Sequence, residues 1–329
     1  MVARGYRNLA DLECEMPPRG VCLLGANAQG KTNLLEAIYY PVLFRSFRGA
    51  PDQQLVGDSP GFYVEARIEG AAARTLAATY AGRKKRITKD REEIGRLADA
   101  VGLWLAVAFL PSDLALASGP ASTRRQYLDR LLSLASQSYF RALARYRAAL
   151  AQRNSALRQG RPDLAQAFDA PLAVSGAELV RTRLKWASGA VEQFAAEFQC
   201  VGEVGEARLQ YRGGTELADE GAWQGTLAAA LPDDRARRMT TIGPHRDDLV
   251  LEIGGRSLRD YGSTGQQRSA AVALKLLESA TLQEACGTEP ALLLDDVFAE
   301  LDRERQSRWA LRLKGPEDRQ LFVTSPRRD

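Results

Sequence analysis

The first part of the chain has apolar and polar positions in patterns that predict strands. Residues 21–25, VCLLG, form an apolar run that predicts a buried strand. Residues 62–70 and 74–88 alternate apolar and polar side chains, and Ala81 with Gly82 supplies a turn. We therefore expect hairpins of an antiparallel sheet in addition to the buried strand.

From Ser122 to about Cys200 the apolar positions recur with the period of a helix. Two faces stand out, formed by Tyr127, Leu128, Leu131, Leu132 and Leu134, and by Tyr139, Phe140, Leu143, Tyr146 and Leu150. The break RQGRPD at 158–163 predicts a join between antiparallel helices, and residues 176–198 predict another long helix. Short strands return at 205–213 and 249–258, followed by helix, strand, helix and a last strand at 320–325. The pattern predicts a sheet-based lobe whose two halves are separated by a helical insertion.

The composition indicates a globular chain with room for one to three domains. Of its 329 residues, 45% are hydrophobic and 26% are charged. No stretch approaches the roughly 18 consecutive apolar residues of a membrane span, and the first residues lack the apolar run of a secretory signal. We expect a cytoplasmic protein with no membrane partner.

Cysteine, histidine and arginine usage narrows the chemistry. Four scattered cysteines and a single histidine predict neither a disulfide framework nor a zinc site. The basic residues are 38 Arg and 7 Lys. Arginine binds phosphate in a bidentate way, so this bias is compatible with a nucleic-acid partner, although a GC-rich genome would produce it as well.

A phosphate-binding loop follows the first buried strand. Residues 25–32, GANAQGKT, fit the pattern G-x-x-x-x-G-K-[ST]. Backbone N–H groups of such a loop point at the β-phosphate, the lysine reaches the β- and γ-phosphates, and the hydroxyl can ligate Mg²⁺. The alternative is a simple strand-to-helix turn. The candidate nucleotide ligands are Gly25, Asn27, Ala28, Gly30, Lys31, Thr32 and Asn33.

A pair of carboxylates ends the apolar run at 291–302, ALLLDDVFAELD. A buried parallel strand would carry Asp295 to the sheet edge where the phosphate loop also lies, so Asp295 is a candidate Mg²⁺ ligand together with Thr32. Asp296 is the candidate that polarises the attacking water. Asp302 lies where a dimer-facing loop would turn. The alternative is that these carboxylates only cap the next helix.

A second anion-binding device precedes the helix expected after Tyr261. The segment at 261–282 reads YGSTGQQRSAAVALKLLESATL. The anion-binding groups would be Ser263, Gly265, Gln266 and the first helical N–H groups. Two such devices can serve one nucleotide only if two copies of the chain meet head to tail.

Taken together, the motifs resemble the ATP-binding-cassette ATPases and, in their specific forms, the bacterial RecF family of recombination mediators. The segments similar to that family are GANAQGKTNLLEAIY at 25–39, TTIGPHRDDL at 240–249, GSTGQQRSAAVALKLLE at 262–278 and LLLDDVFAELD at 292–302. Further similar segments are SFRG at 46–49, FLPSDL at 109–114 and TRRQYLD at 123–129. The resemblance covers nearly the whole chain.

The resemblance implies an α/β fold, an ABC-ATPase head with a P-loop core and an antiparallel β subdomain, plus a mainly α-helical second lobe. The expected parts are 1–115 with the phosphate loop, 116–235 as the helical insertion, and 236–329 with the signature and the carboxylate pair. ATP and Mg²⁺ would lie between Lys31 and Thr32 of one subunit and Ser263 of the other. The implied catalytic residues are Lys31, Asp295, Asp296 and Ser263.

The resemblance also implies a role in DNA repair and replication, in the response to DNA damage. The family forms ATP-dependent homodimers on double-stranded DNA near single-stranded gaps and works with RecO and RecR to direct RecA loading. ATP hydrolysis, weak and DNA-dependent, would release the dimer, and the protein would be associated with the nucleoid. In most related ATPases a Glu stands at Asp296, so slow hydrolysis is expected.

Other classes of protein remain as alternatives. The first is a cassette ATPase of a membrane transporter, but Thr324 and Ser325 stand where such proteins have a switch histidine. Long-armed chromosome-organising ATPases separate their two motifs by hundreds of residues, more than lie between Thr32 and Ser263. A DNA clamp that binds ATP without hydrolysing it is the third. Compared with the RecF family, Ala26 replaces a frequent Glu, and both ends of this chain are short.

Two weaker features stay open. His245, in IGPHRDDLVLEI, either couples the nucleotide to the insertion or belongs to a loop pinned by Arg–carboxylate pairs. The basic run at 82–89, GRKKRITK, either contacts DNA phosphates or protects a sheet edge. The candidate DNA ligands are Arg83, Lys84, Lys85, Arg86, Arg124 and Arg125, with structural ion pairs as the alternative for the last two.

Overall fold

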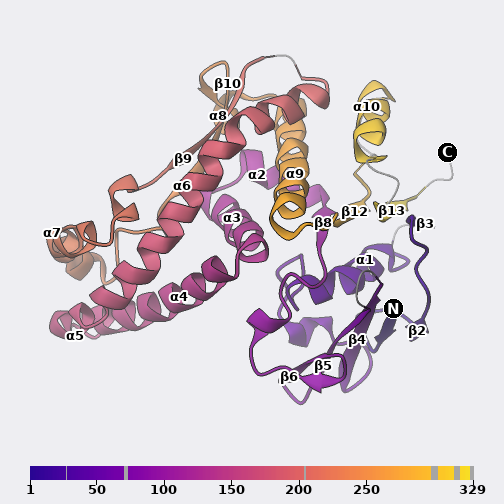
Figure 1. Ribbon diagram of the computed structural model, residues 1–329, viewed down its shortest axis with the longest axis horizontal. Helices are drawn as coiled ribbons and strands as arrows, with labels where there is room; N and C mark the ends of the chain where they lie inside the picture. The colour runs from indigo at the N-terminus through magenta and orange to yellow at the C-terminus, as the bar shows by residue number, and fades with distance from the viewer. Residues whose placement is uncertain (27, 70–72, 204, 298–302, 315–318, 327–329) are drawn as a thin grey trace. The chain divides into compact units, whose positions relative to one another are not determined.

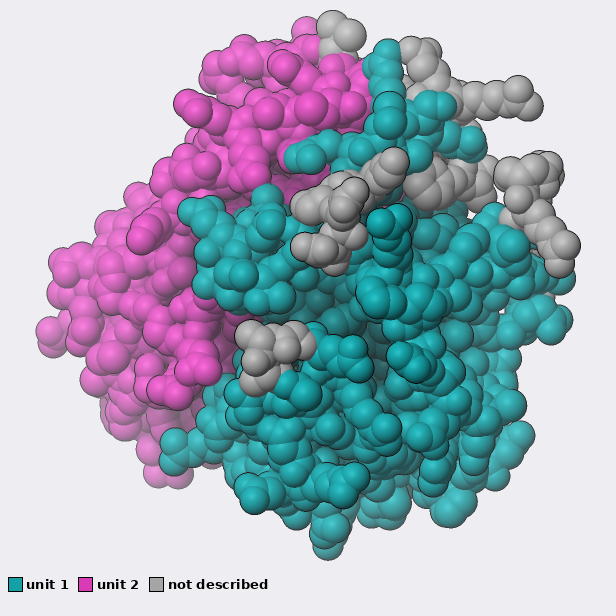
Figure 2. Space-filling model, turned by 45° about the vertical axis from the view of Figure 1, so that its right-hand side comes forward, with its two compact units in different colours: residues 1–113, 278–329 teal, residues 114–277 magenta. Residues whose placement is uncertain are grey.

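The computed structural model describes residues 1–26, 28–69, 73–203, 205–297, 303–314 and 319–326. The chain divides into two compact units (Figure 2), Met1–Asp113 with Glu278–Asp329, and Leu114–Leu277. Among the described helices, none has the length and apolar character needed to cross a membrane.

A four-stranded parallel sheet lies in the first unit (Figure 1). Its order is β3 (Gly20–Leu24), β13 (Leu321–Ser325), β12 (Ala291–Asp295) and β8 (Ala106–Phe109). All residues of β12 and β8 are buried. The prediction of a buried strand at 21–25 is only partly right, because β3 lies at the edge of the sheet and Leu24 is 46% exposed. Helix α1 (Lys31–Tyr39) follows β3 and buries its second half.

The predicted antiparallel hairpins form the second sheet of this unit. Its order is β2 (Leu12–Glu13), β1 (Val2–Arg4), β4 (Gly61–Ile68), β5 (Arg74–Ala81), β6 (Lys84–Lys89) and β7 (Glu92–Glu93). Between β5 and β6, Gly82 and Arg83 have φ angles of +55° and +64°. Two successive residues with positive φ match the right-handed twist of a tight hairpin. The predicted turn at Ala81–Gly82 is therefore confirmed, displaced by one residue.

An aromatic cluster packs this sheet against α1 and the segment after it. Tyr6, Tyr40 and Phe44 are fully buried, and the rings of Tyr6 and Tyr40 meet Phe62 edge to face at 5.3 and 5.4 Å. Short 3₁₀ turns, the helical residues 278–286 and one more helix complete the unit. The turns are Tyr40–Val42, Asp52–Leu55, Leu97–Asp99 and Pro111–Leu114, and the helix is α10 (Arg303–Lys314).

The second unit contains the predicted helices. They are α2 (Ala115–Ser118), α3 (Ala121–Ala135), α4 (Gln137–Arg158), α5 (Pro162–Gln166), α6 (Asp169–Cys200) and α7 (Ala222–Arg237). The break at 158–163 falls at the end of α4 as expected. Gly176 on α6 is required by packing, since a Cβ there would lie 2.3 Å from the ring of Trp223 on α7.

The second unit also contains a small antiparallel sheet. This sheet shows that the boundary expected at residue 235 does not separate two compact units. It consists of β11 (Arg256–Ser257), β10 (Asp248–Ile253) and β9 (Ala207–Arg212), followed in the chain by α8 (Leu258–Tyr261) and α9 (Thr264–Cys286), with a 3₁₀ turn at Thr215–Ala218. The ladder pairs every residue of β9 with one of β10. Because β9 precedes the expected boundary at 235 and β10 follows it, residues 236–277 belong to the same compact unit as the helices.

Candidate nucleotide-binding site

The phosphate loop connects β3 to α1 in the first unit. Gly30 caps α1 with φ +88°, and a Cβ there would lie 3.3 Å from the side chains of Asn8 and Leu9. The Lys31 ammonium donates to the carbonyl oxygens of Gly25 at 2.7 Å and Ala26 at 2.9 Å. The lysine therefore lies over the loop that is expected to bind the nucleotide phosphates.

The two expected metal ligands meet in the structure, although 263 positions separate them in the chain. The Thr32 hydroxyl donates to Asp295 Oδ1 at 2.8 Å. Asp295 is 6% exposed, and burial raises its pKa, while hydrogen bonds from Thr32 and Thr324 lower it. A hydroxyl and a carboxylate at one point are hard oxygen ligands, of the kind that bind Mg²⁺ together with nucleotide phosphates. The residues present therefore fit this metal ion.

Asp296 leaves the end of β12 in an unusual backbone conformation. Its φ is +50°, and its backbone N–H donates to Thr324 Oγ1 at 2.9 Å. This places a second carboxylate beside Asp295 at the carboxyl end of the sheet, as the sequence predicts.

Asn27 and Asp302, two other candidates for nucleotide binding, lie outside the described residues.

A polar cluster beside α1 was not foreseen from the sequence. Glu36, on α1, is fully buried and accepts hydrogen bonds from Arg7 Nη2 at 3.1 Å and from the Ser46 hydroxyl. These contacts hold the segment 46–49 against α1. The Arg48 guanidinium donates to Asn33 Oδ1 at 3.0 Å, next to the phosphate loop.

Asn33 also shows what sequence reasoning missed at this place. It donates to Asn8 Oδ1 at 2.6 Å, so the candidate nucleotide ligand is engaged by Asn8 and Arg48. The only signal for Arg48 was its place in the segment SFRG, which resembles the family but has no motif chemistry of its own. The contact between Arg48 and Asn33 depends on the tertiary fold.

The signature residues form a reciprocal cap at the start of α9 in the second unit. Ser263 Oγ accepts from the Gln266 N–H at 3.2 Å, and Gln266 Oε1 accepts from the Ser263 N–H at 3.0 Å. This is a capping box, which satisfies two donors of the first turn. Gly265 lies between them, so its N–H belongs to the same helix start. Gln267 Nε2 donates to the carbonyl oxygen of Leu258 at 3.0 Å and so ties α9 to α8.

His245 lies in a loop of the second unit and is held from both sides. Its Nδ1 is 2.6 Å from the Tyr146 hydroxyl, and its Nε2 is 3.0 Å from the Thr240 carbonyl oxygen. The carbonyl can only accept, so Nε2 carries the proton and Nδ1 accepts from the tyrosine. Burial lowers the pKa of His245 to about 4. These contacts pin the loop through Tyr146 and its own backbone. The sequence interpretation of a loop pinned by Arg–carboxylate pairs corresponds instead to the pair of Arg124 with Asp248.

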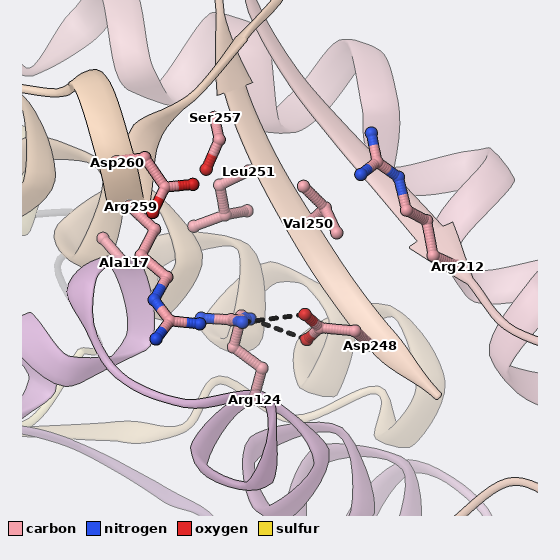
Figure 3. A pocket seen from close by; sticks show the side chains of 9 residues that line it. All are labelled: Ala117, Arg124, Arg212, Asp248, Val250, Leu251, Ser257, Arg259 and Asp260. Atoms are coloured by element: carbon pink, nitrogen blue, oxygen red, sulfur yellow. Dashed lines mark hydrogen bonds and ion pairs between the residues drawn. The ribbon is translucent and has the colours of Figure 1, made fainter. Parts of the chain in front are cut away.

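Arg124 is a structural residue and corrects one of the predicted DNA contacts. Its side chain is 5% exposed, and Nε and Nη2 each donate at 2.8 Å to the two oxygens of Asp248, as Figure 3 shows. Its Nη1 donates to the Gly119 carbonyl oxygen at 2.9 Å. The arginine lies in the wall of a pocket with Arg259 and Asp260. The ion-pair alternative is the right one for Arg124.

The other candidate DNA ligands divide in the same way. Arg125 Nη1 donates to the Asp247 carbonyl oxygen at 2.7 Å, and Lys85 pairs with Asp52 at 2.7 Å. Arg86 pairs with Glu93 at 3.1 Å, and both side chains are exposed. Arg83 and Lys84 are exposed, and their side chains make no ion pair with the described residues. They remain exposed cations of the hairpin that no described carboxylate neutralises.

Comparison with known proteins finds relatives along the whole chain. The "DNA replication and repair protein RecF" of Geobacter sulfurreducens is 36% identical over 331 residues, which cover 97% of this chain and 90% of the relative. No model of a known protein family matches the chain.

Two solved structures place the fold. One, of "the recombination mediator protein RecF-ATP in RecFOR pathway", has a TM-score of 0.92 and 31% identity and covers 100% of this chain and 91% of that one. The Smc head domain of Pyrococcus furiosus has a TM-score of 0.56 at 14% identity, over 99% of this chain and 88% of its own. The second likeness concerns the fold alone. Together they show an α/β ATPase-head fold.

Proposed function

Because this chain belongs to the RecF family of DNA replication and repair proteins, we propose that it is an ATP-dependent recombination mediator that binds double-stranded DNA. The observation that carries the proposal is the contact between Thr32 and Asp295 at 2.8 Å, beside a complete phosphate loop. Such a pair of oxygens beside a lysine serves a nucleoside triphosphate with its metal ion. The similarity to a RecF–ATP structure supports ATP as that nucleotide.

The chain's own residues would divide the work on ATP. Loop N–H groups and Lys31 would bind the phosphates, and Thr32 and Asp295 would hold Mg²⁺, which neutralises developing charge on the phosphoryl oxygens. Asp296 would polarise the attacking water. Aspartate is one methylene shorter than glutamate, so hydrolysis would be slow and would serve to release the protein from DNA.

Two copies of the chain would share each nucleotide. Ser263 and Gln266 cap the start of α9 in the other compact unit. Ser263, Gly265 and the first N–H groups of this helix would serve as a second anion-binding device. In a head-to-tail homodimer each copy would offer this device to the phosphate loop of its partner. ATP would then act as the link that closes the dimer around or beside DNA.

The DNA substrate and partners follow from the family. We propose binding at junctions between double-stranded DNA and single-stranded gaps, with RecO and RecR as partners that direct RecA loading. The exposed cations Arg83 and Lys84 would contact phosphates, so recognition would read backbone and shape. Such a protein would work in the cytoplasm on the nucleoid.

The dimer can be tested by light scattering with and without ATP and Mg²⁺. The wild type is expected to double its mass with ATP, whereas Lys31→Met should stay monomeric because the phosphates lose their lysine. Ser263→Arg should also stay monomeric, since the bulky cation would block the partner's nucleotide, yet it should still bind ATP. Dimerisation of Ser263→Arg on ATP would exclude the head-to-tail arrangement.

Hydrolysis and DNA binding need separate assays. Duplex affinity should rise with ATP for the wild type and stay at its basal value for Lys31→Met. Turnover should fall in Asp296→Asn while ATP binding and dimerisation persist. If Asp296→Asn hydrolyses ATP at the wild-type rate, Asp296 does not polarise the water; if the wild type shows no turnover above Lys31→Met, the protein is a clamp that binds ATP only.

A further inference from the structure

Thr324 places a buried hydroxyl between the two carboxylates at the end of β12. The residue is 2% exposed. Strand β13 pairs with β12 in parallel, and Thr324 stands opposite Asp295 in the register. Residues paired across neighbouring strands present their side chains on the same face of a sheet. The hydroxyl therefore reaches the carboxylate pair from the adjacent strand.

The Thr324 hydroxyl has more hydrogen-bond partners within reach than it can bond at the same time. Thr324 Oγ1 accepts from the Asp296 N–H at 2.9 Å and lies 3.0 Å from Asp295 Oδ1 and 3.4 Å from Asp296 Oδ1. A hydroxyl has one proton and two lone pairs. It can accept from the backbone and donate to one carboxylate at a time, and the shorter distance favours Asp295.

The backbone contact fixes how the chain leaves the sheet. Asp296 has a φ of +50°, in the left-handed region that side chains other than glycine adopt at a cost. Its N–H bond to Thr324 stabilises this conformation and sets the direction of the Asp296 carboxylate. Shielding from water makes both contacts of the hydroxyl stronger than they would be at the surface.

We infer that Thr324 is a positioning residue for the carboxylate pair: its hydroxyl holds Asp296 in the left-handed turn and orients Asp295 toward Thr32. The inference rests on the proposed ATP hydrolysis, in which Asp295 holds the metal ion and Asp296 polarises the water. Thr324 acts through these groups, so its loss slows the chemical step and leaves nucleotide binding nearly intact.

Two variants separate the hydroxyl from the shape of the side chain. Thr324→Val keeps a β-branched residue in the strand and removes the hydroxyl, whereas Thr324→Ser keeps the hydroxyl. We expect kcat to fall roughly ten- to hundredfold in Thr324→Val, the range for a lost hydrogen bond to a charged group, with KM for ATP within about threefold. Thr324→Ser should retain kcat within about threefold of the wild type. Equal kcat values in the two variants would overturn the inference.

A second readout needs neither ATP nor turnover. Amide hydrogen exchange at Asp296 in the nucleotide-free protein should speed up at least tenfold in Thr324→Val and stay near the wild-type rate in Thr324→Ser, because the N–H loses its acceptor. Equal exchange in the two variants would refute the positioning role. If the wild type lacks turnover above Lys31→Met, the proposed hydrolysis fails, and this exchange measurement still decides the role of Thr324.

Discussion

His245 shows how burial sets the charge of a single side chain. Its ring lies between the Tyr146 hydroxyl, which donates to the unprotonated Nδ1, and the Thr240 carbonyl oxygen, which accepts from Nε2. Burial is the main cause of its low pKa, and the nearby positive charges of Arg246 and Arg125 lower it further. The neutral ring therefore holds residues 240–245 to helix α4 and has no free nitrogen for chemistry.

The low pKa makes this contact sensitive to acid. In the unfolded chain a histidine binds its proton near pH 6.5, whereas folded His245 does so only near pH 4. Its stabilising effect is present above pH 6.5 and is lost as the pH falls toward 4. We expect the free energy of unfolding to drop by ~2 kcal/mol between pH 7 and pH 5 from this group. Denaturant titrations at several pH values measure it.

His245→Gln is the control, because glutamine does not titrate. Its unfolding free energy should be lower than that of the wild type at pH 7, and the difference should shrink toward pH 5. A wild-type pH dependence that is unchanged in His245→Gln would show that other groups account for it.

Among the elements, the hairpin of β5 and β6 depends on its turn. Gly82 has φ +55°, and the space around its Cβ position is open, so only the backbone conformation opposes a side chain there. Gly82→Ala should lower stability by about 1 kcal/mol. Gly189→Ala in helix α6, where the surrounding space is also open, should raise stability by about 0.5–1 kcal/mol. Opposite signs in thermal unfolding would confirm the turn; a loss in both variants would contradict it.

The ion pair of Arg124 and Asp248 joins helix α3 to strand β10. The guanidinium is nearly buried and makes two bonds to the carboxylate. Arg124→Ala leaves Asp248 without its partner, so we expect a loss of about 3 kcal/mol in unfolding free energy. Arg141→Ala, an exposed arginine on α4, should change it by less than about 0.5 kcal/mol. If Arg124→Ala is as stable as the wild type and binds duplex DNA more weakly, Arg124 is a DNA contact after all.

At the scale of the whole molecule, the affinity for duplex DNA should depend on the salt concentration. Each phosphate contact releases counterions, so affinity falls steeply with salt concentration. Replacing Arg83 and Lys84 by alanine should weaken duplex binding and reduce the slope of log K against log salt by about 2. Fluorescence anisotropy at several salt concentrations measures both quantities.

A matched variant tests whether total charge alone is responsible. Arg158 and Arg161 are exposed basic residues at the join of α4 and α5. Replacing both by alanine removes the same charge and should leave the salt slope unchanged. Equal slopes in the two double variants would remove the hairpin from the DNA interface.

Local patterns determined much of the fold and the site. The loop at 25–32, the carboxylates after 291–294 and the alternation at 62–88 depend on residues close in the chain, so the sequence predicts them directly. The end of helix α4 near Arg158 follows from the turn residues at 158–163 in the same way. The resemblance to a known family then indicated that these motifs belong to one ATPase.

The tertiary structure decided which distant residues meet. The sheet order, with β13 between β3 and β12, brings Thr324 to Asp295 and Thr32, and no local pattern encodes a pairing over such distances. The ladder of β9 and β10 moved residues 236–277 into the helical unit. Burial, too, is a property of the folded chain, and it shows Arg124 in a structural ion pair, where the sequence left both an ion pair and a phosphate contact open. The sequence alone specified the chemical groups, and the fold fixed their neighbours and their exposure to water.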